Sequence, residues 1–404
     1  MSIEEKLKKD DRDIFLLKTE HPVAYFGLGA IKKLDDIIKD LKNKDIDKYM
    51  IITDSIILQA TRIDNYIKNL FEENDIEYII YKEVRANPSY EGCDEATKIA
   101  KENNVKAFIS IGGGSHHDTA KVAAALLKQP NVNTIDFFEK GVKVENAAPI
   151  VCINTTHGTG SELNNTAVAQ SDGSFKLGKK SPYFYPTYTI EDPELTLTLP
   201  KKQTIAVSLD SFHHAFESLT TKIRNPYTAD LSSKAIALVS KWLPIVNAEP
   251  HNIKARYWLM YSSAIAGGIS LDISGAHVTH GLEHPMGAIN PKVIHGVGLT
   301  AIFPSILKLT YKVFPELLAE VLNPIIPDLK GFSSEADYAA KRIEQWFKDM
   351  GCPEKMIDLE LTEKDIPNLI KSAKVSGKAN FERAPFEITD DLLATIYKES
   401  LYHS

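Results

Sequence analysis

The sequence changes its periodicity once, near residue 195, and this change constrains the fold more than any other feature. Before that point, short apolar runs alternate with helical patterns, which is typical of an open parallel sheet. The apolar runs cover residues 49–53, 76–81, 107–111 and 149–153, and the expected helices between them cover about 57–73 and 90–103. We therefore predict an α/β N-terminal part built on a parallel sheet.

After Leu195 the strand-like alternation nearly disappears, and helical periods take over. The expected helices cover about 201–221, 228–247, 252–271, 275–288, 297–313, 335–350, 363–375 and 389–400. Pro193 and Pro200 punctuate the change of period. We predict two domains, an α/β domain over residues 1–194 and an all-helical domain over residues 195–404.

Composition excludes several classes of protein. Of the 404 residues, 43% are hydrophobic and 25% are charged, which are the proportions of a globular chain. The 47 basic and 54 acidic residues give a net charge of -7 without a basic cluster, so we expect no nucleic-acid partner. The sequence offers neither a membrane-spanning apolar stretch nor an apolar secretory signal in its first residues, so we expect a cytoplasmic protein. Its three scattered cysteines are expected to be free thiols.

Three consecutive glycines, Gly112, Gly113 and Gly114, follow the apolar run 107–111 and precede a helical pattern. Without side chains, glycines let backbone N–H groups approach a phosphate at the positive end of a helix. The alternative is a tight turn from strand to helix that binds nothing. The loop is not the G-x-G-x-x-G fingerprint of the commonest dinucleotide-binding fold.

Asp54 directly follows the apolar run 49–53. A carboxylate at this place can accept hydrogen bonds from both ribose hydroxyls of an adenosine and repel a 2′-phosphate, which favours NAD over NADP. The alternative is an aspartate that caps the following helix.

A carboxylate and several imidazoles recur at helical spacing in the second half. Asp210 and His214 are four residues apart, so both side chains leave the same face of a helix. His280 and His284 repeat this spacing, and His295 follows. One carboxylate with three imidazoles suits Fe(II) or Zn(II) and can keep a position open for substrate. The alternative is that these histidines are ordinary surface or core residues.

Four segments together resemble one known family. The segments GGGSHHDTAK (112–121) and TTHGTGSE (155–162) resemble the GGGSxxDxAK and TTxGTGSE motifs of iron-containing alcohol dehydrogenases. The segment DSFHHAFE (210–217) is similar to the DALxHAxE motif of that family, and HGLEHP (280–285) with His295 is similar to its HxxxHP…HG region. This group III family shares its fold with glycerol dehydrogenase and dehydroquinate synthase, and the resemblance covers nearly the whole chain.

The resemblance implies a role for each matching residue. It implies that the metal ligands are Asp210, His214, His280 and His295, and that the cofactor pyrophosphate is held by Gly112, Gly113, Gly114 and Ser115. It implies that the cofactor is further lined by Thr155, Thr156 and Thr159, with Asp118 near its nicotinamide end. Asp54 matches the residue that selects NAD, and His284 matches a histidine that faces the substrate. A homodimer is also implied.

The chain departs from the family pattern at two places. The segment 290–294, between the last two implied metal ligands, is one residue longer than in well-known members, which bears on substrate size. His116, His117 and His157 stand where many members carry small residues or proline, and we expect them to alter the surroundings of the cofactor.

We therefore predict a metal-dependent, NAD-linked dehydrogenase that interconverts a small alcohol or diol and its aldehyde or ketone. The metal polarises the substrate oxygen, the nicotinamide accepts the hydride, and His284 relays the proton. One alternative is a lyase or cyclase of the dehydroquinate synthase type that uses NAD transiently. It needs several cationic groups, and the candidates are Lys176, Lys179, Lys180 and Lys292. A second alternative is a non-catalytic protein stabilised by metal, although structural zinc sites are commonly rich in cysteine.

Overall fold

The computed structural model describes residues 22–171 and 175–403. The first residues of the chain, in which we expected no secretory signal, lie outside the described residues. Within these ranges no helix has both the length and the apolar character needed to cross a membrane. Cys93, Cys152 and Cys352 are buried and free, as expected.

A six-stranded sheet forms the centre of the N-terminal part, with the strand order β1-β8-β5-β4-β2-β3. The strands are β1 (Val23–Phe26), β2 (Lys48–Ile52), β3 (Glu77–Tyr81), β4 (Ala107–Gly112), β5 (Ile150–Asn154) and β8 (Tyr188–Glu191). Every neighbouring pair is parallel. The predicted parallel sheet is therefore confirmed, although the two short strands β1 and β8 were not predicted.

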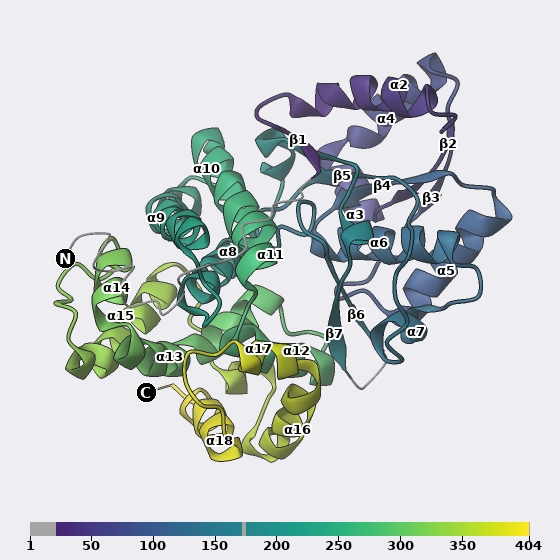
Figure 1. Ribbon diagram of the computed structural model, residues 1–404. Coiled ribbons are helices and arrows are strands. Elements are labelled where there is room, and N and C mark those ends of the chain that lie inside the picture. Colours follow the sequence, from purple (N-terminus) through teal and green to yellow (C-terminus); the bar gives the residue numbers. More distant parts are fainter. Residues whose placement is uncertain (1–21, 172–174, 404) are drawn as a thin grey trace.

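Helices cover both faces of this sheet because its strands bury alternate side chains on opposite sides. Tyr49 and Ile51 of β2 pack on the face of helices α2 (Leu34–Lys42) and α4 (Ile63–Glu73). Met50 and Ile52 pack on the other face, against α5 (Tyr90–Glu102) and α6 (Gly114–Lys128). Figure 1 shows α2 and α4 above the sheet and α5 and α6 below it. The short helices α3 (Ser55–Thr61) and α7 (Thr134–Phe138) complete this part.

The order of the strands brings several predicted residues to one edge of the sheet. From β2 the chain passes to β3 on one side and then to β4 on the other, so the direction of winding reverses at β2. In open parallel sheets, ligands bind at the carboxyl ends of the strands beside such a reversal. Asp54 follows β2, the glycine loop ends β4, and Thr155 follows β5.

A two-stranded antiparallel hairpin, β6 (Thr166–Gln170) and β7 (Lys176–Lys180), stands apart from the main sheet. The sequence did not predict it, because the second strand reads KLGKK, with lysines and a glycine in place of β-branched residues.

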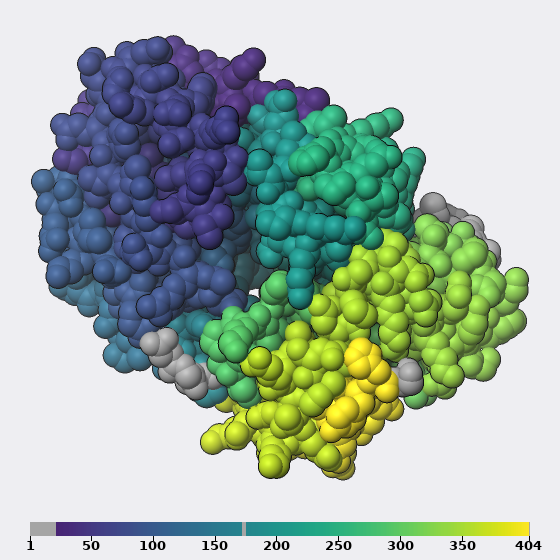
Figure 2. All heavy atoms as spheres, turned by 180° about the vertical axis from the view of Figure 1, so that it is seen from behind, coloured from purple at the N-terminus to yellow at the C-terminus, as the bar shows by residue number. Residues whose placement is uncertain are grey.

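The second part of the chain is helical, as predicted. Its helices are α8 (Lys201–Thr220), α9 (Pro226–Ala248), α10 (Ile253–Ser263), α11 (Leu271–Ser274), α12 (Val278–Ile289), α13 (His295–Val313), α14 (Pro315–Val321), α15 (Ala336–Asp349), α16 (Ile366–Ser376), α17 (Lys378–Glu382) and α18 (Asp390–Glu399). A cluster of buried aromatic rings from α8, α13 and α15 lies at its centre, including Phe212, Phe303 and Phe347. Figure 2 shows the two parts side by side with a hollow between them.

Two predicted helices are interrupted. The helix expected over 57–73 is divided at Arg62, whose φ of 54° lies in the left-handed region. The helix expected over 252–271 contains a π-helical segment, Ala264–Ser270, between α10 and α11. Inside it, Gly267 and Gly268 lie so close to the loop 155–160 that a Cβ on Gly160 would come within 2.1 Å of the backbone of Gly268. This contact with another loop accounts for the irregularity at a place where the sequence pattern alone predicts a regular helix.

Candidate metal and cofactor site

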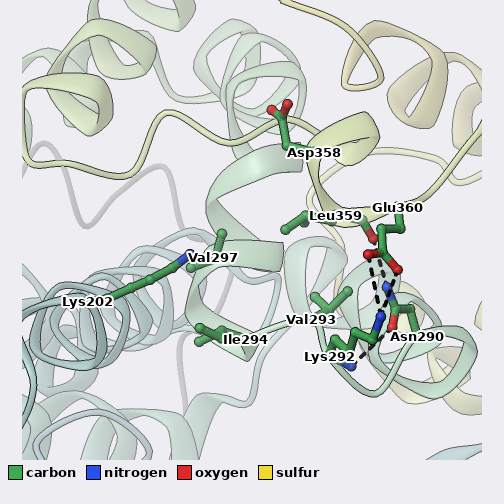
Figure 3. Close-up of a pocket in the computed structure, with 9 residues that line it drawn as sticks. All are labelled: Lys202, Asn290, Lys292, Val293, Ile294, Val297, Asp358, Leu359 and Glu360. Atoms are coloured by element: carbon green, nitrogen blue, oxygen red, sulfur yellow. Dashed lines mark hydrogen bonds and ion pairs between the residues drawn. The ribbon is translucent and has the colours of Figure 1, made fainter.

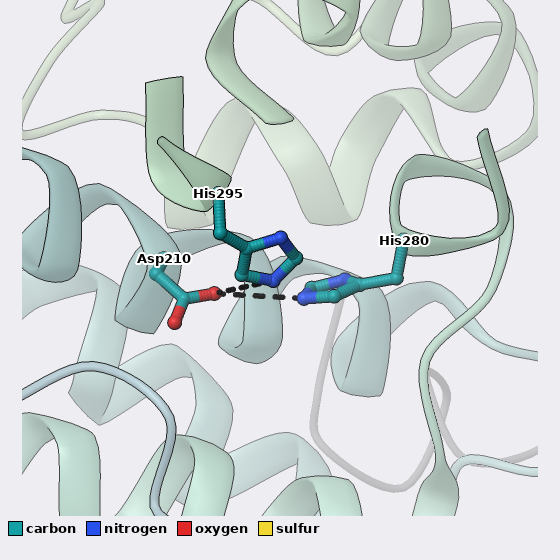
Figure 4. Close-up of side chains that lie close together, drawn as sticks. All are labelled: Asp210, His280 and His295. Carbon is teal, nitrogen blue, oxygen red and sulfur yellow. Dashed lines mark ion pairs between the residues drawn. The ribbon is translucent and has the colours of Figure 1, made fainter. Parts of the chain in front are cut away.

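Three imidazoles converge on one carboxylate oxygen in the helical part. Asp210 and His214 lie one turn apart on α8, and Nε2 of His214 is 3.6 Å from Oδ1 of Asp210. Nε2 of His280, from α12, is 3.5 Å from the same oxygen, and Nε2 of His295, the first residue of α13, is 3.7 Å from it. Figure 4 shows Asp210, His280 and His295 pointing toward one another. Tetrahedral ligands that each lie about 2.0–2.2 Å from one ion are roughly 3.3–3.6 Å apart, so the distances of the three imidazoles from Asp210 fit a shared ion. The donor atoms of Asp210, His280 and His295 also lie within 4.8 Å of one another, a group that does not include His214.

The electrostatics of this cluster also fit a cation. Asp210 Oδ1 and His280 Nε2 are buried and have no hydrogen-bond partner among the described residues. Buried polar atoms in folded proteins nearly always have one. Although burial disfavours a charged imidazole, the carboxylates of Glu217 and Asp210 raise the pKa of His280 to about 10. The cluster therefore favours positive charge at its centre, and its oxygen and nitrogen donors suit a divalent metal.

Each of the three imidazoles is oriented through its other nitrogen. Nδ1 of His280 donates to Glu217 in a short hydrogen bond, and Nδ1 of His295 donates to Glu283 Oε2 at 2.5 Å. Nδ1 of His214 donates to the backbone carbonyl of Gly158 at 3.2 Å. Because these acceptors keep a hydrogen on each Nδ1, Nε2, which is directed at Asp210, is the nitrogen that can give up its proton and bind a metal.

Glu217 and Glu283 orient two of these histidines. Neither residue was predicted from the sequence, although Glu217 lies in the segment 210–217 and Glu283 in the segment 280–285. Oε1 of Glu217 accepts backbone hydrogen bonds from His277 at 3.1 Å and from Thr279 at 2.7 Å. Burial would raise the pKa of the Glu217 carboxyl, but the neighbouring imidazoles, His280 above all, outweigh it and lower the pKa to about 2. Glu217 is therefore an ionised acceptor that holds His280 and the start of α12 together.

His284 lies beside this cluster and not within it. Its ring centroid is 5.8 Å from that of His295 and 6.2 Å from that of His280. The side chain is half-buried, so part of it remains accessible. Its donor atoms group with those of Glu283 and His295, while the donor atoms of Asp210 group with those of His280 and His295.

The glycine loop is interlocked with the threonine-rich loop 155–160. A Cβ on Gly113 would lie 2.8 Å from Thr156, and a Cβ on Gly114 would lie 2.7 Å from Thr159. The N–H of Thr155 donates to the carbonyl of Gly112 at 2.9 Å. The glycines are thus needed for packing. They also begin α6, whose first-turn N–H groups point toward the carboxyl edge of the sheet and can bind an anion.

Asp54 caps the N-terminus of α3, which was one of the two interpretations of this residue from the sequence. Its Oδ1 accepts a hydrogen bond from the N–H of Ile57 at 2.8 Å. Its Oδ2 lies 3.0 Å from Nε2 of His116, in the first turn of α6. The hydrogen bond from His116, together with the cap, holds the pKa of Asp54 below its usual value. The cap accounts for one carboxylate oxygen, and the other faces the glycine loop.

Asp118 and Lys121 form a buried network one turn further along α6. The carboxylate of Asp118 accepts from Ser161 Oγ at 2.5 Å and from the N–H of Val168 at 3.0 Å, and burial raises its pKa. Nζ of Lys121 donates to Ser161, Asn164 and Thr166, and burial lowers its pKa. Both residues therefore tie the hairpin and the threonine-rich loop to α6.

Ser115 is also engaged by the protein. Its hydroxyl accepts from the N–H of Asn87 at 3.2 Å, which holds the segment after β3 against the glycine loop.

His157, in the threonine-rich loop, is fully buried and donates from Nε2 to Ser208 Oγ on α8 at 3.0 Å. The loop 155–160 therefore touches both the glycine loop and the helix that carries Asp210.

The segment 290–294 borders a separate pocket of about 140 Å³. Figure 3 shows its lining residues, which are Lys202, Asn290, Lys292, Val293, Ile294, Val297, Asp358, Leu359 and Glu360. Lys292 pairs there with Glu360 at 3.2 Å. None of the predicted metal-binding, cofactor-binding or proton-relay residues lines this pocket, so it is distinct from the cluster around Asp210.

Comparisons with known proteins identify the same family over nearly the whole chain. Residues 22–193 match the family "Iron-containing alcohol dehydrogenase", and residues 204–401 match the C-terminal part of the same family. A long-chain primary alcohol dehydrogenase of Thermoanaerobacter ethanolicus is 41% identical over 97% of this chain and 99% of its own. An NAD-dependent methanol dehydrogenase of Bacillus methanolicus is 29% identical over 87% of this chain and 91% of its own.

Solved structures show the same architecture. The alcohol dehydrogenase of Oenococcus oeni superposes with a TM-score of 0.86 at 26% identity, covering 95% of this chain and 100% of its own. An NADH-dependent butanol dehydrogenase of Thermotoga maritima superposes with a TM-score of 0.86 at 24% identity, covering 96% of this chain and 99% of its own. At that identity the second likeness concerns the fold alone.

Proposed function

Because the chain belongs to the iron-containing alcohol dehydrogenase family, and is therefore an oxidoreductase that acts on alcohols, we propose that it interconverts a primary alcohol and its aldehyde. We propose that it uses NAD in preference to NADP and a divalent metal, Fe(II) or Zn(II). The observation that carries this proposal is the convergence of three imidazole Nε2 atoms on Asp210 Oδ1.

We propose that the metal is held by Asp210, His214, His280 and His295. When bound there, a divalent metal supplies Lewis-acid polarisation of the substrate oxygen, which lowers the pKa of the alcohol. Glu217, Glu283 and the Gly158 carbonyl keep the Nε2 lone pairs of the three histidines directed at Asp210. The partly exposed His284, beside His295, is proposed to take the proton of the alcohol and pass it to solvent.

We propose that the dinucleotide lies across the carboxyl edge of the sheet. Its pyrophosphate would lie on Gly112, Gly113, Gly114 and Ser115, at the N-terminus of α6. Thr155, Thr156 and Thr159 would line its path, with Asp118 behind the nicotinamide end. Asp54 would accept the adenosine ribose hydroxyls and repel a 2′-phosphate. The reversal of winding at β2 supports this place for the cofactor.

The proposed substrate is a broader class than the small alcohol or diol that we expected from the sequence. The relatives named above are described as acting on long-chain primary alcohols and on methanol. A hydroxyl on a terminal carbon is common to both, so we propose a primary alcohol and leave its chain length to experiment.

The lyase or cyclase alternative is not favoured. It requires cationic side chains that are free to hold an anionic substrate, and three of the four candidate lysines are paired with carboxylates. Lys176 lies 3.8 Å from Glu283, Lys180 lies 3.4 Å from Asp272, and Lys292 lies 3.2 Å from Glu360. The fourth, Lys179, donates to the carbonyl of Val142 at 3.0 Å.

The proposal is tested by NADH oxidation with anaerobically purified protein. The protein is stripped of metal, reloaded with ferrous or zinc ion, and supplied with straight-chain aldehydes of increasing length, with ketones and with hydroxyaldehydes. We expect turnover that returns with one metal, is fastest with an aldehyde, and is lost in Asp210→Ala. The control variant His251→Ala removes an exposed histidine and should keep full activity. Full metal content and full rate in Asp210→Ala would contradict the site assignment.

Three further expectations remain predictions. The homodimer rests on the resemblance to the family, the cytoplasmic location rests on the distribution of apolar residues along the sequence, and the division into domains at residues 194 and 195 rests on the change of periodicity. Light scattering, cell fractionation and limited proteolysis, respectively, would test them.

A further inference from the structure

His116 joins two elements on opposite sides of the reversal of winding. It lies in the first turn of α6, after β4, and its Nε2 is 3.0 Å from Oδ2 of Asp54, after β2. The imidazole is nine-tenths buried, whereas the side chain of Asp54 is 26% exposed. The contact thus fixes Oδ2 of Asp54, while part of the carboxylate remains accessible to solvent.

The hydrogen-bond pattern indicates which ring nitrogen of His116 carries the hydrogen. The ionised carboxylate of Asp54 can only accept, so Nε2 of His116 donates. Nδ1 of His116 is buried and has no partner among the described residues. It lies over Gly112, where a Cβ would come within 2.3 Å of it. A neutral ring with its hydrogen on Nε2 leaves no buried N–H unpaired, so the pair keeps the negative charge of Asp54.

The two hydrogen bonds leave Asp54 one orientation. Its Oδ1 is held by the N–H of Ile57 and its Oδ2 by His116. Each carboxylate oxygen can accept a second hydrogen bond, so both can still receive a ribose hydroxyl. A carboxylate held from two sides cannot rotate away from an incoming phosphate, which makes the repulsion of a 2′-phosphate more effective.

We propose that His116 is a positioning residue that determines cofactor specificity by holding the Asp54 carboxylate toward the 2′-position of the adenosine ribose. This inference rests on the proposed function, because it presupposes that NAD binds at this edge of the sheet. It predicts that the preference for NAD over NADP depends on a hydrogen-bond donor at position 116. The competing interpretation is that His116 only fills the space over Gly112.

The test measures dinucleotide binding without turnover. The dissociation constants of NADH and of NADPH are measured by fluorescence titration for the wild type and for the matched pair His116→Gln and His116→Met. These two side chains have similar length, but only glutamine donates a hydrogen bond. We expect His116→Met to lower the preference for NADH by about tenfold, as loss of a hydrogen bond to a charged group implies. We expect His116→Gln to retain most of the preference.

A double-mutant cycle with Asp54→Ala separates the two interpretations. If His116 acts through Asp54, then His116→Met changes the ratio of the two dissociation constants only when Asp54 is present. An equal change in the Asp54→Ala background would overturn the inference. Thermal unfolding of each variant checks the fold, and His116→Ala replaces His116→Met if the latter does not fold.

The outcomes for the wild type distinguish this inference from the proposed function. A wild type that binds neither dinucleotide overturns the proposed function, and the inference with it. A wild type that prefers NADH, with a ratio unchanged in folded His116→Met, overturns only the inference. A wild type that prefers NADPH overturns the inference together with the proposed preference for NAD, and leaves the proposed metal-dependent dehydrogenase reaction in place.

Discussion

The backbone carbonyl of Gly158 accepts a hydrogen bond from Nδ1 of His214 at 3.2 Å. Gly158 belongs to the same loop as Thr156 and Thr159, which pack against the glycine loop. The carboxylate of Asp210 is also near, since a Cβ on Gly158 would lie 3.1 Å from its Oδ2. A loop that we propose to line the cofactor thus orients a residue that we propose to bind the metal.

This contact predicts that metal and NADH assist each other's binding. Ordering of the loop by either ligand prepares the other site, and the coupling must be reciprocal. Calorimetric titration should give a several-fold smaller dissociation constant for NADH in zinc-loaded protein than in metal-free protein. Exposed His251→Ala should show the same coupling as the wild type. Equal affinities in the two forms would contradict the prediction.

Glu217→Gln should weaken metal binding by about 10–100-fold, the usual effect of altering a group that orients a metal-binding histidine. The amide keeps the shape of the side chain but removes the charge that holds His280. Competition with a chromophoric chelator measures the affinity. The control Glu360→Gln removes an exposed carboxylate and should leave the affinity unchanged. Wild-type affinity in Glu217→Gln would refute an orienting role for this carboxylate.

His117 should make the protein sensitive to mild acid. Burial lowers the pKa of this histidine from 6.5 to about 3, so the unfolded chain takes up the proton first as the pH falls. Its contribution to stability is complete above pH 6.5 and is lost progressively between pH 6.5 and pH 3. Between pH 7.5 and pH 5 the loss from this one group should be about 2 kcal/mol.

Urea unfolding at the two pH values measures this effect. In His117→Asn the side-chain amide can still meet Ser110, which lies 2.9 Å from Nδ1 of His117, but it does not titrate. The fall in unfolding free energy should therefore be about 2 kcal/mol smaller in this variant than in the wild type. The exposed control His251→Asn should behave as the wild type does, and a similar fall in all three proteins would contradict the prediction.

Lys121→Met should lower the free energy of unfolding by about 3–5 kcal/mol, because it leaves Asp118 buried without its cation. Part of this loss should return in the double variant with Asp118→Asn, whose amide is neutral. Lys128→Met, at the exposed end of the same helix, should change stability by at most about 0.5 kcal/mol. Equal free energies of unfolding for Lys121→Met and Lys128→Met would show that the buried network contributes little to stability.

The central strands were predictable because β2, β4 and β5 are almost entirely buried and therefore read as continuous apolar runs. The short strand β1 is partly exposed, with Val23 at 53%, and carries no comparable pattern. The π-helical segment depends on a contact between Gly267 and a loop about a hundred residues earlier in the chain, which no local pattern can encode.

Helical spacing placed Asp210 and His214 on one face of α8, and the structure has them there. That His295 reaches the same carboxylate depends on how α12 and α13 pack, and only the family resemblance indicated it. Glu217 is seven residues after Asp210, on the same helix face, so spacing could have suggested its role. The contact between His116 and Asp54 could not be predicted without the order of the strands, since these residues are 62 positions apart.

The interlocking of the two loops limits how this enzyme can be altered. A random mutational screen will record Gly113 and Gly114 as intolerant even in an assay that contains no dinucleotide, because a side chain there collides with Thr156 or Thr159. Intolerance at these positions therefore reports the assembly of the chain rather than its choice of ligand. Changes of coenzyme preference during evolution are expected instead at positions 54 and 116, where a substitution leaves the packing between the two loops intact.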